Sequence, residues 1–478
     1  MTTKSKKMLA IDMGATSVRG ILAWQEDGHL KTREIGRFSH EPVQNGDGLF
    51  WDFQGILHKI TDMILRCGEE IGSIGVDCWG VDFSLLDTEG NLILPPHAYR
   101  DPANHAAHEA FRAKLSDEEA FEETGIQVMD INTVYQLYRL KMEEGDSYGR
   151  IHHVLMLSDL ICYYLTGEMH TDLSALSTSQ LYHTGTHSFS RKILDILELP
   201  ESAFPPLATY GSFRGSTRNA RIPSLRQYSI PVCSVAGHDT ADAALVTAAM
   251  NDPDTLFLSC GTWSLLGAVR DQAIITPDAY KADFTNELTV GGHSLFLKNI
   301  TGLYVLEKFK KQMEKRTGQD IRYHEITEKA ARFDNCDFIF DIDDPVFMQD
   351  DFDAKAAITL ALQYLGKSVP EDDFGYFASI YQSLAEKYRT TAEALARITG
   401  RTYRRMQVIG GGAKSDLLCR LIADRLNIPV LAGPQEATAL GNLALQMTAS
   451  EQFTDIRKAA AFAADSEQQK LYSPKKEG

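Results

Sequence analysis

The chain has 478 residues, more than one hydrophobic core usually supports, so two sizeable domains are expected. Its 44% hydrophobic and 24% charged residues are typical of a globular protein and exclude a disordered or fibrous chain. The net charge of -17 argues against binding along a nucleic-acid backbone, which needs clustered Lys and Arg, so an anionic ligand would need a local site.

The N-terminal sequence MTTKSKKMLAIDMG begins with lysines and continues into an alternating strand, without the apolar run and cleavage site of a secretory signal. No run of about 18 uninterrupted apolar residues predicts a membrane span. The seven cysteines are scattered and never spaced as C-x-x-C, which favours free thiols in a reducing compartment over a zinc site. We therefore expect a cytoplasmic protein with neither a membrane nor a nucleic-acid partner.

The first predicted element is a β-hairpin at residues 9–22, whose turn runs from Gly14 to Arg19. Glycine lets backbone N–H groups and the hydroxyls of Thr16 and Ser17 approach a phosphate closely. Asp12, at the end of the first strand, is placed to hold a hydrated magnesium ion. An ordinary hairpin turn with a capping aspartate would give the same pattern.

Two short strands are predicted next, on either side of Trp79 and Gly80. Trp79 and Asp82 are candidates for a sugar site, with the indole against C–H groups and the carboxylate on hydroxyls. The alternative is that Trp79 simply belongs to the core. Residues 133–165 show helical periodicity with a break at Gly145.

The segment GHDTADAALV, residues 237–246, follows an apolar strand and is predicted to begin a helix. Asp239 at such a junction can act as general base toward a substrate hydroxyl, and the helix N-terminus favours a nearby anion. Asp239 or Thr240 can equally be a helix N-cap, and one residue can have both roles.

A second predicted hairpin, residues 256–269, repeats the first at a constant offset of 247 positions. The matched residues are Leu9, Gly14, Ser17 and Gly20 with Leu256, Gly261, Ser264 and Gly267. Although two glycine-turn hairpins can agree by chance, an offset of about half the chain favours a duplicated domain. Because residues 251–254 are turn-forming, we expect domains at 1–250 and 251–478. Gly261 and Thr262 would then form a second phosphate turn.

The last motif, IGGGAKS at residues 409–415, lies between a predicted strand and a predicted helix. Its glycines, Gly411 and Gly412 among them, allow a nucleotide to approach the backbone closely. It is not a Walker A motif, and a tight strand-to-helix connection is the alternative.

Together these segments resemble the carbohydrate kinase family named for a Phe-Gly-Gly-Tyr (FGGY) signature. The resemblance spans Ile11 to Asn442 and is carried by GVDCWGVDFSLLD, AYRD, NTVYQL, HDTADA, LSCGTWSLLG, TNE, LKNITGLY, VIGGG and AGPQEATALGN. It implies an α/β fold of two ribonuclease-H-like, actin-like domains around a catalytic cleft, with ATP as phosphoryl donor and Mg²⁺ as cofactor. The blocks are most similar to those of members that phosphorylate L-rhamnulose at its 1-hydroxyl. L-fuculose or another ketose, or a catalytically silent sugar or nucleotide sensor, are the alternatives.

The resemblance also implies roles for individual residues. Asp239 would be the catalytic base, and Asp12 would hold Mg²⁺ through water. The sugar would be surrounded by Trp79, Gly80, Asp82, His238, Asp239, Thr240 and Asn299. The nucleotide would be surrounded by Gly14, Ala15, Thr16, Ser17, Arg19, Gly261, Thr262, Glu307, Gly411 and Gly412. Glu307 stands where a glutamine is common in the family, which would put an anion near the nucleotide. The oligomeric state, monomer or homodimer, stays open.

Overall fold

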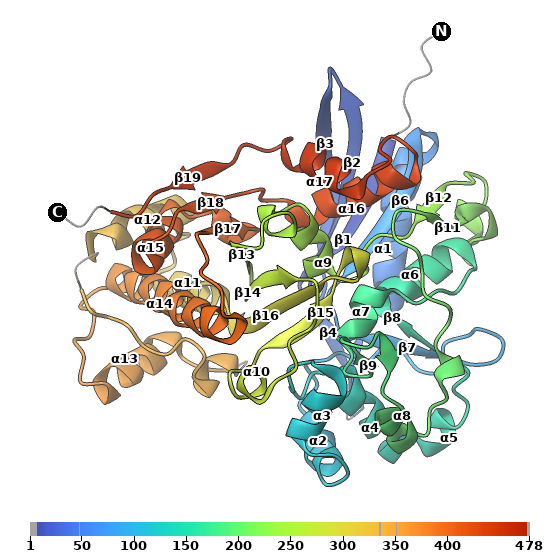
Figure 1. Cartoon of the computed structure of the whole chain (residues 1–478), viewed down its shortest axis with the longest axis horizontal. Coiled ribbons are helices and arrows are strands. Elements are labelled where there is room, and N and C mark those ends of the chain that lie inside the picture. Colours follow the sequence, from blue (N-terminus) through green and yellow to red (C-terminus); the bar gives the residue numbers. More distant parts are fainter. Residues whose placement is uncertain (1–6, 47, 334–335, 350, 476–478) are drawn as a thin grey trace. The chain divides into compact units, whose positions relative to one another are not determined.

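The computed structural model describes residues 7–46, 48–333, 336–349 and 351–475 (Figure 1). The chain divides into two compact units, and neither is one continuous stretch of sequence. Unit 1 comprises the chain up to Val246, together with Arg270–Phe296 and Thr438–Ser466. Unit 2 comprises Thr247–Val269, Leu297–Ala437 and the chain from Glu467 onward.

Unit 1 is built on a six-stranded sheet whose strand order is β11-β12-β6-β1-β2-β3. Its strands are β1 (Lys7–Met13), β2 (Ser17–Glu26), β3 (His29–Ser39), β6 (Ile71–Cys78), β11 (Phe213–Ser216) and β12 (Pro231–Cys233). The predicted first hairpin is confirmed, since β1 pairs antiparallel with β2. On its other side β1 pairs parallel with β6, and its residues from Met8 to Met13 are all buried, so both of its faces are covered. The alternating pattern expected from the sequence is therefore wrong for this strand.

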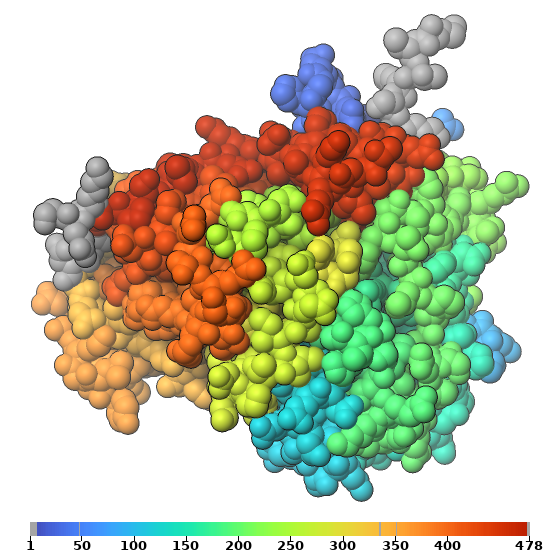
Figure 2. All heavy atoms as spheres, in the orientation of Figure 1, coloured from blue at the N-terminus to red at the C-terminus, as the bar shows by residue number. Residues whose placement is uncertain are grey.

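Helices pack against this sheet, among them α1 (Phe53–Cys67), α6 (Leu157–Thr166) and α9 (Asp239–Leu245). Helix α1 begins at Asp52, whose carboxylate accepts a hydrogen bond from the N–H of Gly55. From the C-terminal part of the chain come α16 (Ala437–Ala449) and α17 (Ile456–Ala464). Figure 2 shows α17, in red, beside the protruding β2–β3 hairpin in blue.

Helix α16 approaches α9 so closely that only glycine fits at one position. A Cβ atom on Gly441 would lie 1.9 Å from the carbonyl oxygen of Asp242.

The remaining elements of unit 1 are smaller: β4 (Pro42–Asn45), β5 (Gly48–Trp51), β7 (Phe83–Leu86), β8 (His153–Met156), β9 (Tyr182–His183), β10 (Ser188–Phe189), β15 (Thr285–Leu288), α2 (Asn104–Arg112), α3 (Asp117–Thr124), α4 (Thr133–Glu143), α5 (Gly145–Tyr148), α7 (Leu173–Ser177), α8 (Arg191–Leu197) and α10 (Pro277–Lys281).

Two local predictions in unit 1 have different outcomes. The strands expected on either side of Trp79–Gly80 are β6 and β7, as predicted. Residues 133–165 contain α4, α5 and α6 as expected, but they also contain the strand β8, which the helical interpretation missed. Four residues are too few to show a period, and β8 forms by pairing with the distant strand β7.

The second predicted hairpin is confirmed in unit 2, where β13 (Thr255–Cys260) pairs antiparallel with β14 (Trp263–Arg270). These strands belong to a sheet with the strand order β15-β16-β14-β13-β17-β18-β19, whose first strand, β15, comes from the segment Arg270–Phe296 of unit 1. The further strands are β16 (Ser294–Thr301), β17 (Arg405–Ile409), β18 (Val430–Ala432) and β19 (Lys470–Tyr472).

The two sheets share one sequence of pairings, as a duplicated domain predicts. In each, the first hairpin strand is parallel to the next strand inward, which is parallel to a third, and that third strand is antiparallel to the last. The hairpins differ in one detail. Three residues separate β1 from β2 and two separate β13 from β14, so Gly20 pairs with Ile11 whereas Gly267 pairs with Phe257.

The α-helices of unit 2 among the described residues are α11 (Tyr304–Thr317), α12 (Tyr323–Ala330), α13 (Ala354–Tyr364), α14 (Asp373–Thr399) and α15 (Asp416–Leu426). The long helix α14 begins at Asp372, whose side chain caps it, and ends at Gly400 in the left-handed conformation. The strand, glycine turn and helix predicted at the end of the chain are β17, the turn at Gly411–Lys414 and α15. Within the part of the chain that the structure describes, no helix is both long and apolar enough to cross a membrane.

Candidate functional site

The first glycine turn joins β1 to β2 and carries Asp12 at its base. Asp12 is 4% exposed and forms an ion pair with Arg19, its neighbour across the hairpin. The N–H of Gly14 donates to the carbonyl of Ser17 at 3.0 Å, which closes the turn. Thr16, at the tip, is exposed. The turn therefore presents backbone and a hydroxyl to solvent above a charged pair.

Asp77 and Asp239 gather beside Asp12 in unit 1. Asp77 lies on β6 directly opposite Asp12, is fully buried, and accepts a 2.6 Å hydrogen bond from Nδ2 of Asn442. Burial, and next the charge of Asp12, raise the pKa of Asp77 well above its usual range. The same two causes, in the same order, raise the pKa of Asp239 to about 7. Carboxyls that raise one another's pKa in this way are typical of a site for a cation or a proton acceptor.

The turn that carries Asp239 packs against α6 and α7. A Cβ on Gly237 would lie 2.5 Å from Oγ of Ser158, so the backbone passes very close to that side chain. The N–H of His238 donates to Oγ of Ser174 at 3.0 Å, and that hydroxyl donates to Asp172 at 2.5 Å. Asp239 is the first residue of α9, and its side chain keeps 29% of its surface exposed. A carboxyl with a raised pKa is thus available to a ligand.

Trp79 and Asp82 are buried side by side. Nε1 of Trp79 and Nε1 of Trp51 both donate to Oδ2 of Asp82, at 2.8 and 2.6 Å. Asp82 has no exposed surface, and burial raises its pKa to about 7. The Asp82 carboxyl therefore holds the two indole rings in place.

Between them, Gly80 and Val81 form a strained turn. Val81 has a φ of +65°, rare for a β-branched residue. Two hydrogen bonds hold its backbone: the N–H donates to Oγ1 of Thr178 at 2.9 Å, and the carbonyl accepts from Oγ1 of Thr133 at 2.5 Å. A Cβ on Gly80 would lie 2.8 Å from the same Thr178 hydroxyl. Strain maintained by its surroundings is often found at ligand sites.

In unit 2, three glycine segments meet around the second hairpin turn. The carbonyl of Gly261 accepts from the N–H of Leu303 at 2.9 Å, and a Cβ on Gly302 would lie 2.7 Å from the carbonyls of both Gly261 and Thr262. A Cβ on Gly412 would lie 2.3 Å from Sγ of Cys260. Thr262 is partly exposed and Gly411 is exposed. The result is a surface of backbone and small side chains, suited to close approach by phosphates.

The two other predicted residues of unit 2 lie on neighbouring elements. Glu307 is on α11, and its carboxylate accepts a hydrogen bond from the hydroxyl of Tyr323. Asn299 is on β16 and is half-buried. The remaining predicted residues all belong to unit 1: Asp12, Gly14, Ala15, Thr16, Ser17, Arg19, Trp79, Gly80, Asp82, His238, Asp239 and Thr240.

Sequence reasoning gave no role to Asp77, Asn442, Gly302 or Glu287. Each lies in a segment that contributed to the family resemblance, which was the available signal. Residue type alone could not identify them, because Asp77 and Asn442 are separated by 365 positions and meet only in the folded unit.

The fit of a magnesium ion depends on the carboxylates beside the first glycine turn. Among the described residues, no three His, Cys, Asp or Glu side chains form a ready cage. Mg²⁺ does not need one, since it commonly binds through one or two carboxylates together with waters and substrate phosphates. The carboxylate of Asp12, which is 4% exposed and paired with Arg19, fits this mode of binding as the single protein carboxylate.

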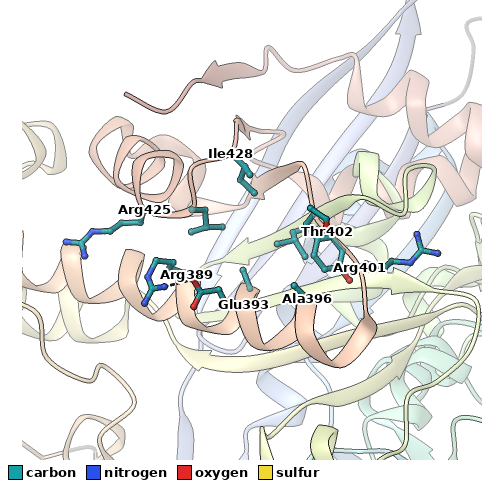
Figure 3. Close-up of a pocket in the computed structure, with 11 residues that line it drawn as sticks. Arg389, Glu393, Ala396, Arg401, Thr402, Arg425 and Ile428 are labelled. Atoms are coloured by element: carbon teal, nitrogen blue, oxygen red, sulfur yellow. Dashed lines mark hydrogen bonds and ion pairs between the residues drawn. The ribbon is translucent and has the colours of Figure 1, made fainter. Parts of the chain in front are cut away.

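A separate cavity of about 220 Å³ lies in unit 2 along α14 and the start of β13 (Figure 3). Its arginines are paired with carboxylates: Arg389 with Glu393, Arg425 with Glu386, and Arg401 with Asp254. None of the sequence-predicted site residues lines it.

Comparison with protein families gives two matches that together span most of the chain. Residues 7–246 match the N-terminal domain, and residues 256–450 the C-terminal domain, of the FGGY family of carbohydrate kinases.

Individual proteins are similar over almost the whole length. The chain is 35% identical over 472 residues to a protein named rhamnulokinase from Bacteroides thetaiotaomicron, covering 98% of this chain and 96% of the relative. It is 33% identical to one of the same name from Enterococcus faecalis, covering 95% and 91%.

Solved structures share the fold at low identity. A ligand-bound xylulose kinase from Lactobacillus acidophilus has a TM-score of 0.79 at 18% identity, over 98% of this chain and 94% of the other. Plasmodium falciparum glycerol kinase with ADP also has a TM-score of 0.79, at 14% identity and the same coverage. The two-domain actin-like fold predicted from the sequence is thereby confirmed.

Proposed function

Because the chain belongs to the FGGY family of carbohydrate kinases, we propose that it transfers the γ-phosphoryl group of ATP to the 1-hydroxyl of L-rhamnulose. The choice of sugar is supported by relatives named rhamnulokinase, similar over nearly the full chain. The choice of reaction is supported by one observation above the others: the partly exposed carboxyl of Asp239, with its pKa raised to about 7, at the start of α9.

Asp239 is proposed as the general base. As the sugar oxygen bonds to the γ-phosphorus, its proton passes to the Asp239 carboxylate, and the bond from that phosphorus to the β,γ-bridging oxygen breaks to release ADP. The chemistry asks the protein mainly for positioning and charge stabilisation. We propose that His238, Thr240, Gly80, Trp79 and Asn299 contact the sugar, with Asp82 acting through Trp79.

The nucleotide is proposed to bind at the glycine turns. In unit 1 these are Gly14, Ala15, Thr16, Ser17 and Arg19, of which Thr16 is exposed and the others are partly exposed. In unit 2 they are Gly261, Thr262, Gly411 and Gly412. Gly302 packs against the first two, and Cys260 packs against the last two. Glu307, whose carboxylate is engaged by Tyr323, is proposed to lie at the nucleotide as well.

Asp12 is proposed to hold Mg²⁺ through water, with Arg19 balancing its charge. When bound, the metal supplies neutralisation of the charge on the phosphate oxygens. We also propose that the enzyme works in the cytoplasm, as a monomer or homodimer, with the sugar and ATP as its small-molecule partners.

The test is kcat/KM for L-rhamnulose, L-fuculose, D-xylulose, L-ribulose and glycerol at fixed Mg-ATP, measured by coupled ADP release. We expect L-rhamnulose first, L-fuculose second, and the others below both. Hydroxyl contacts should decide the order, since burial of a sugar methyl group contributes only about 1–3 kcal/mol. A tenfold preference for L-fuculose, about 1.4 kcal/mol in transition-state binding, would refute the choice of sugar. Absence of phosphorylation for every sugar would refute the proposed reaction.

A further inference from the structure

Strand β15 carries a buried glutamate beside the turn that bears Asp239. The side chain of Glu287 is 8% exposed, and its Oε2 lies 3.3 Å from Nδ1 of His238. On the other side of the same ring, Nε2 of His238 lies 3.4 Å from Oδ1 of Asp239. Glu287, His238 and Asp239 therefore form a row that ends at the proposed base.

The two inner atoms of this row are polar, buried and without other partners. Within the described part of the chain, neither Oε2 of Glu287 nor Nδ1 of His238 has a hydrogen bond. The two atoms lie 3.3 Å apart, close to the donor–acceptor distance of a hydrogen bond. Leaving both unsatisfied would cost free energy, so the pairing is favoured.

The two residues that follow Glu287 are hydrogen-bonded to helices α7 and α9. The N–H of Leu288 donates to Oγ of Ser177 on α7 at 2.9 Å. Oγ1 of Thr289 donates to the carbonyl of Ala241 on α9 at 3.1 Å. Figure 1 shows β15 beside α7. Glu287 is thus fixed relative to the turn, as a residue that orients another must be.

The protonation of Glu287 and His238 determines which nitrogen of the His238 ring carries an N–H. Burial raises the pKa of Glu287 and lowers that of His238, so a net charge on the pair is disfavoured. Three neutral arrangements exist: a protonated Glu287 donating to Nδ1 of a neutral His238, an ionised Glu287 beside a doubly protonated ring, and a protonated Glu287 whose carbonyl oxygen accepts from Nδ1–H of a neutral ring. The first two place a proton on Nε2. A neutral ring with its proton on Nδ1 would instead face the Asp239 carboxylate with a lone pair.

We propose that Glu287 is a positioning residue for phosphoryl transfer: it fixes the ring of His238 with an N–H on Nε2, and that N–H orients the Asp239 carboxylate toward the sugar hydroxyl. The inference rests on the proposed function in taking Asp239 as the base. It assigns Glu287 no direct contact with the sugar.

Two substitutions of similar volume separate this role from packing and from charge. Glu287→Gln keeps a donor for Nδ1, so we expect kcat within about threefold of wild type. Glu287→Met fills the same space without a donor, so we expect kcat to fall on the order of 10- to 100-fold, with KM for ATP unchanged. The same pair at Glu123, a half-buried glutamate that accepts from Ser190 in unit 1, is the control and should leave kcat unchanged.

A double-mutant cycle tests whether the effect passes through His238. In a His238→Gln background, Glu287→Met should cause little further loss of kcat. Equal losses for Glu287→Gln and Glu287→Met would overturn the proposal, because they would indicate that charge or direct sugar contact matters. Wild-type kcat in Glu287→Met would overturn it as well.

The ring state is measured independently of turnover. In protein labelled with ¹⁵N-histidine, the His238 resonances, identified by their loss in His238→Gln, should show a proton on Nε2 in the wild type and in Glu287→Gln. A neutral ring protonated on Nδ1 would refute the inference whatever the substrate is. The kinetic series uses the best sugar of the panel, so an error in the choice of L-rhamnulose leaves this test intact.

Discussion

Asp239 combines accessibility to a ligand with an environment that disfavours its charge. Burial is the larger cause of its raised pKa, and the negative charge of Asp12 is the next. A base with a pKa near the working pH has both a useful fraction ionised and a real affinity for the proton. The sequence predicted Asp239 as the candidate base. Its pKa, however, depends on burial and on Asp12, which only the fold brings close.

The activity should therefore have an acid limb set by Asp239. We expect kcat/KM for the sugar to fall about tenfold per pH unit below about pH 7, because the base must be ionised. Asp12→Asn removes the second cause of the raised pKa, so the midpoint of the limb should move to lower pH even though the rate also falls. An unmoved midpoint in this variant would mean that Asp12 does not act on the titrating group.

Asp239→Asn should lose activity and gain stability. We expect kcat to drop on the order of 10²- to 10⁴-fold, since the amide cannot accept the proton. The folded-state pKa of about 7 exceeds the ordinary value of 3.8, so the wild type loses stability as pH rises from 3.8 to about 7. The variant lacks this loss, and its Tm at pH 8 should exceed that of the wild type by more than at pH 4. A lower Tm at pH 8 would contradict the assignment of the raised pKa.

At the scale of elements, some glycines lie where two backbone segments pack too closely for a side chain to fit. Gly302 lies at the start of α11 against the second hairpin turn, in a space that leaves no room for a Cβ. The sequence predicted the turn, but it could not predict that α11 would begin against it. The strand β8 is a similar case, because its partner β7 lies some 70 positions earlier in the chain.

Gly302→Ala should weaken nucleotide binding selectively. The added methyl would lie 2.6 Å from the carbonyl carbon of Trp263, so the turn that carries Thr262 must shift. We expect KM for ATP to rise several-fold or more while KM for the sugar changes little, as measured by varying each substrate separately. Gly145→Ala, where nothing lies within 4 Å of the added atom, is the control and should match the wild type. A larger effect on the sugar than on ATP would argue against a nucleotide site at this turn.

At the scale of the whole molecule, unit 1 is completed by segments from late in the chain. Asn442 donates to the buried Asp77, and Gln446 accepts a 2.7 Å hydrogen bond from Ser73, so α16 satisfies polar groups on β6. The segment that contains Glu287 likewise belongs to unit 1.

A fragment of residues 1–250 should therefore not fold cooperatively alone. Without α16 it would leave the Asp77 carboxyl and the Ser73 hydroxyl of β6 without their partners. We expect a broad thermal transition by circular dichroism for this fragment, and a cooperative one when residues 251–478 are co-expressed with it. A sharp transition for the isolated fragment, like that of the full chain, would disprove this dependence.

The sequence alone determined the hairpins, their repetition, the glycine turns and the position of Asp239 at a helix start. These follow from signals local to a few residues: alternation of apolar residues, glycine where backbone must turn, and an acidic residue before a helix. Only the tertiary structure decided that Asp77 meets Asn442, that Glu287 stands behind His238, and that residues 270–296 and 438–466 join the first unit. Those partners are far apart in the chain, and their meeting depends on the packing of whole helices and strands, which no local pattern specifies.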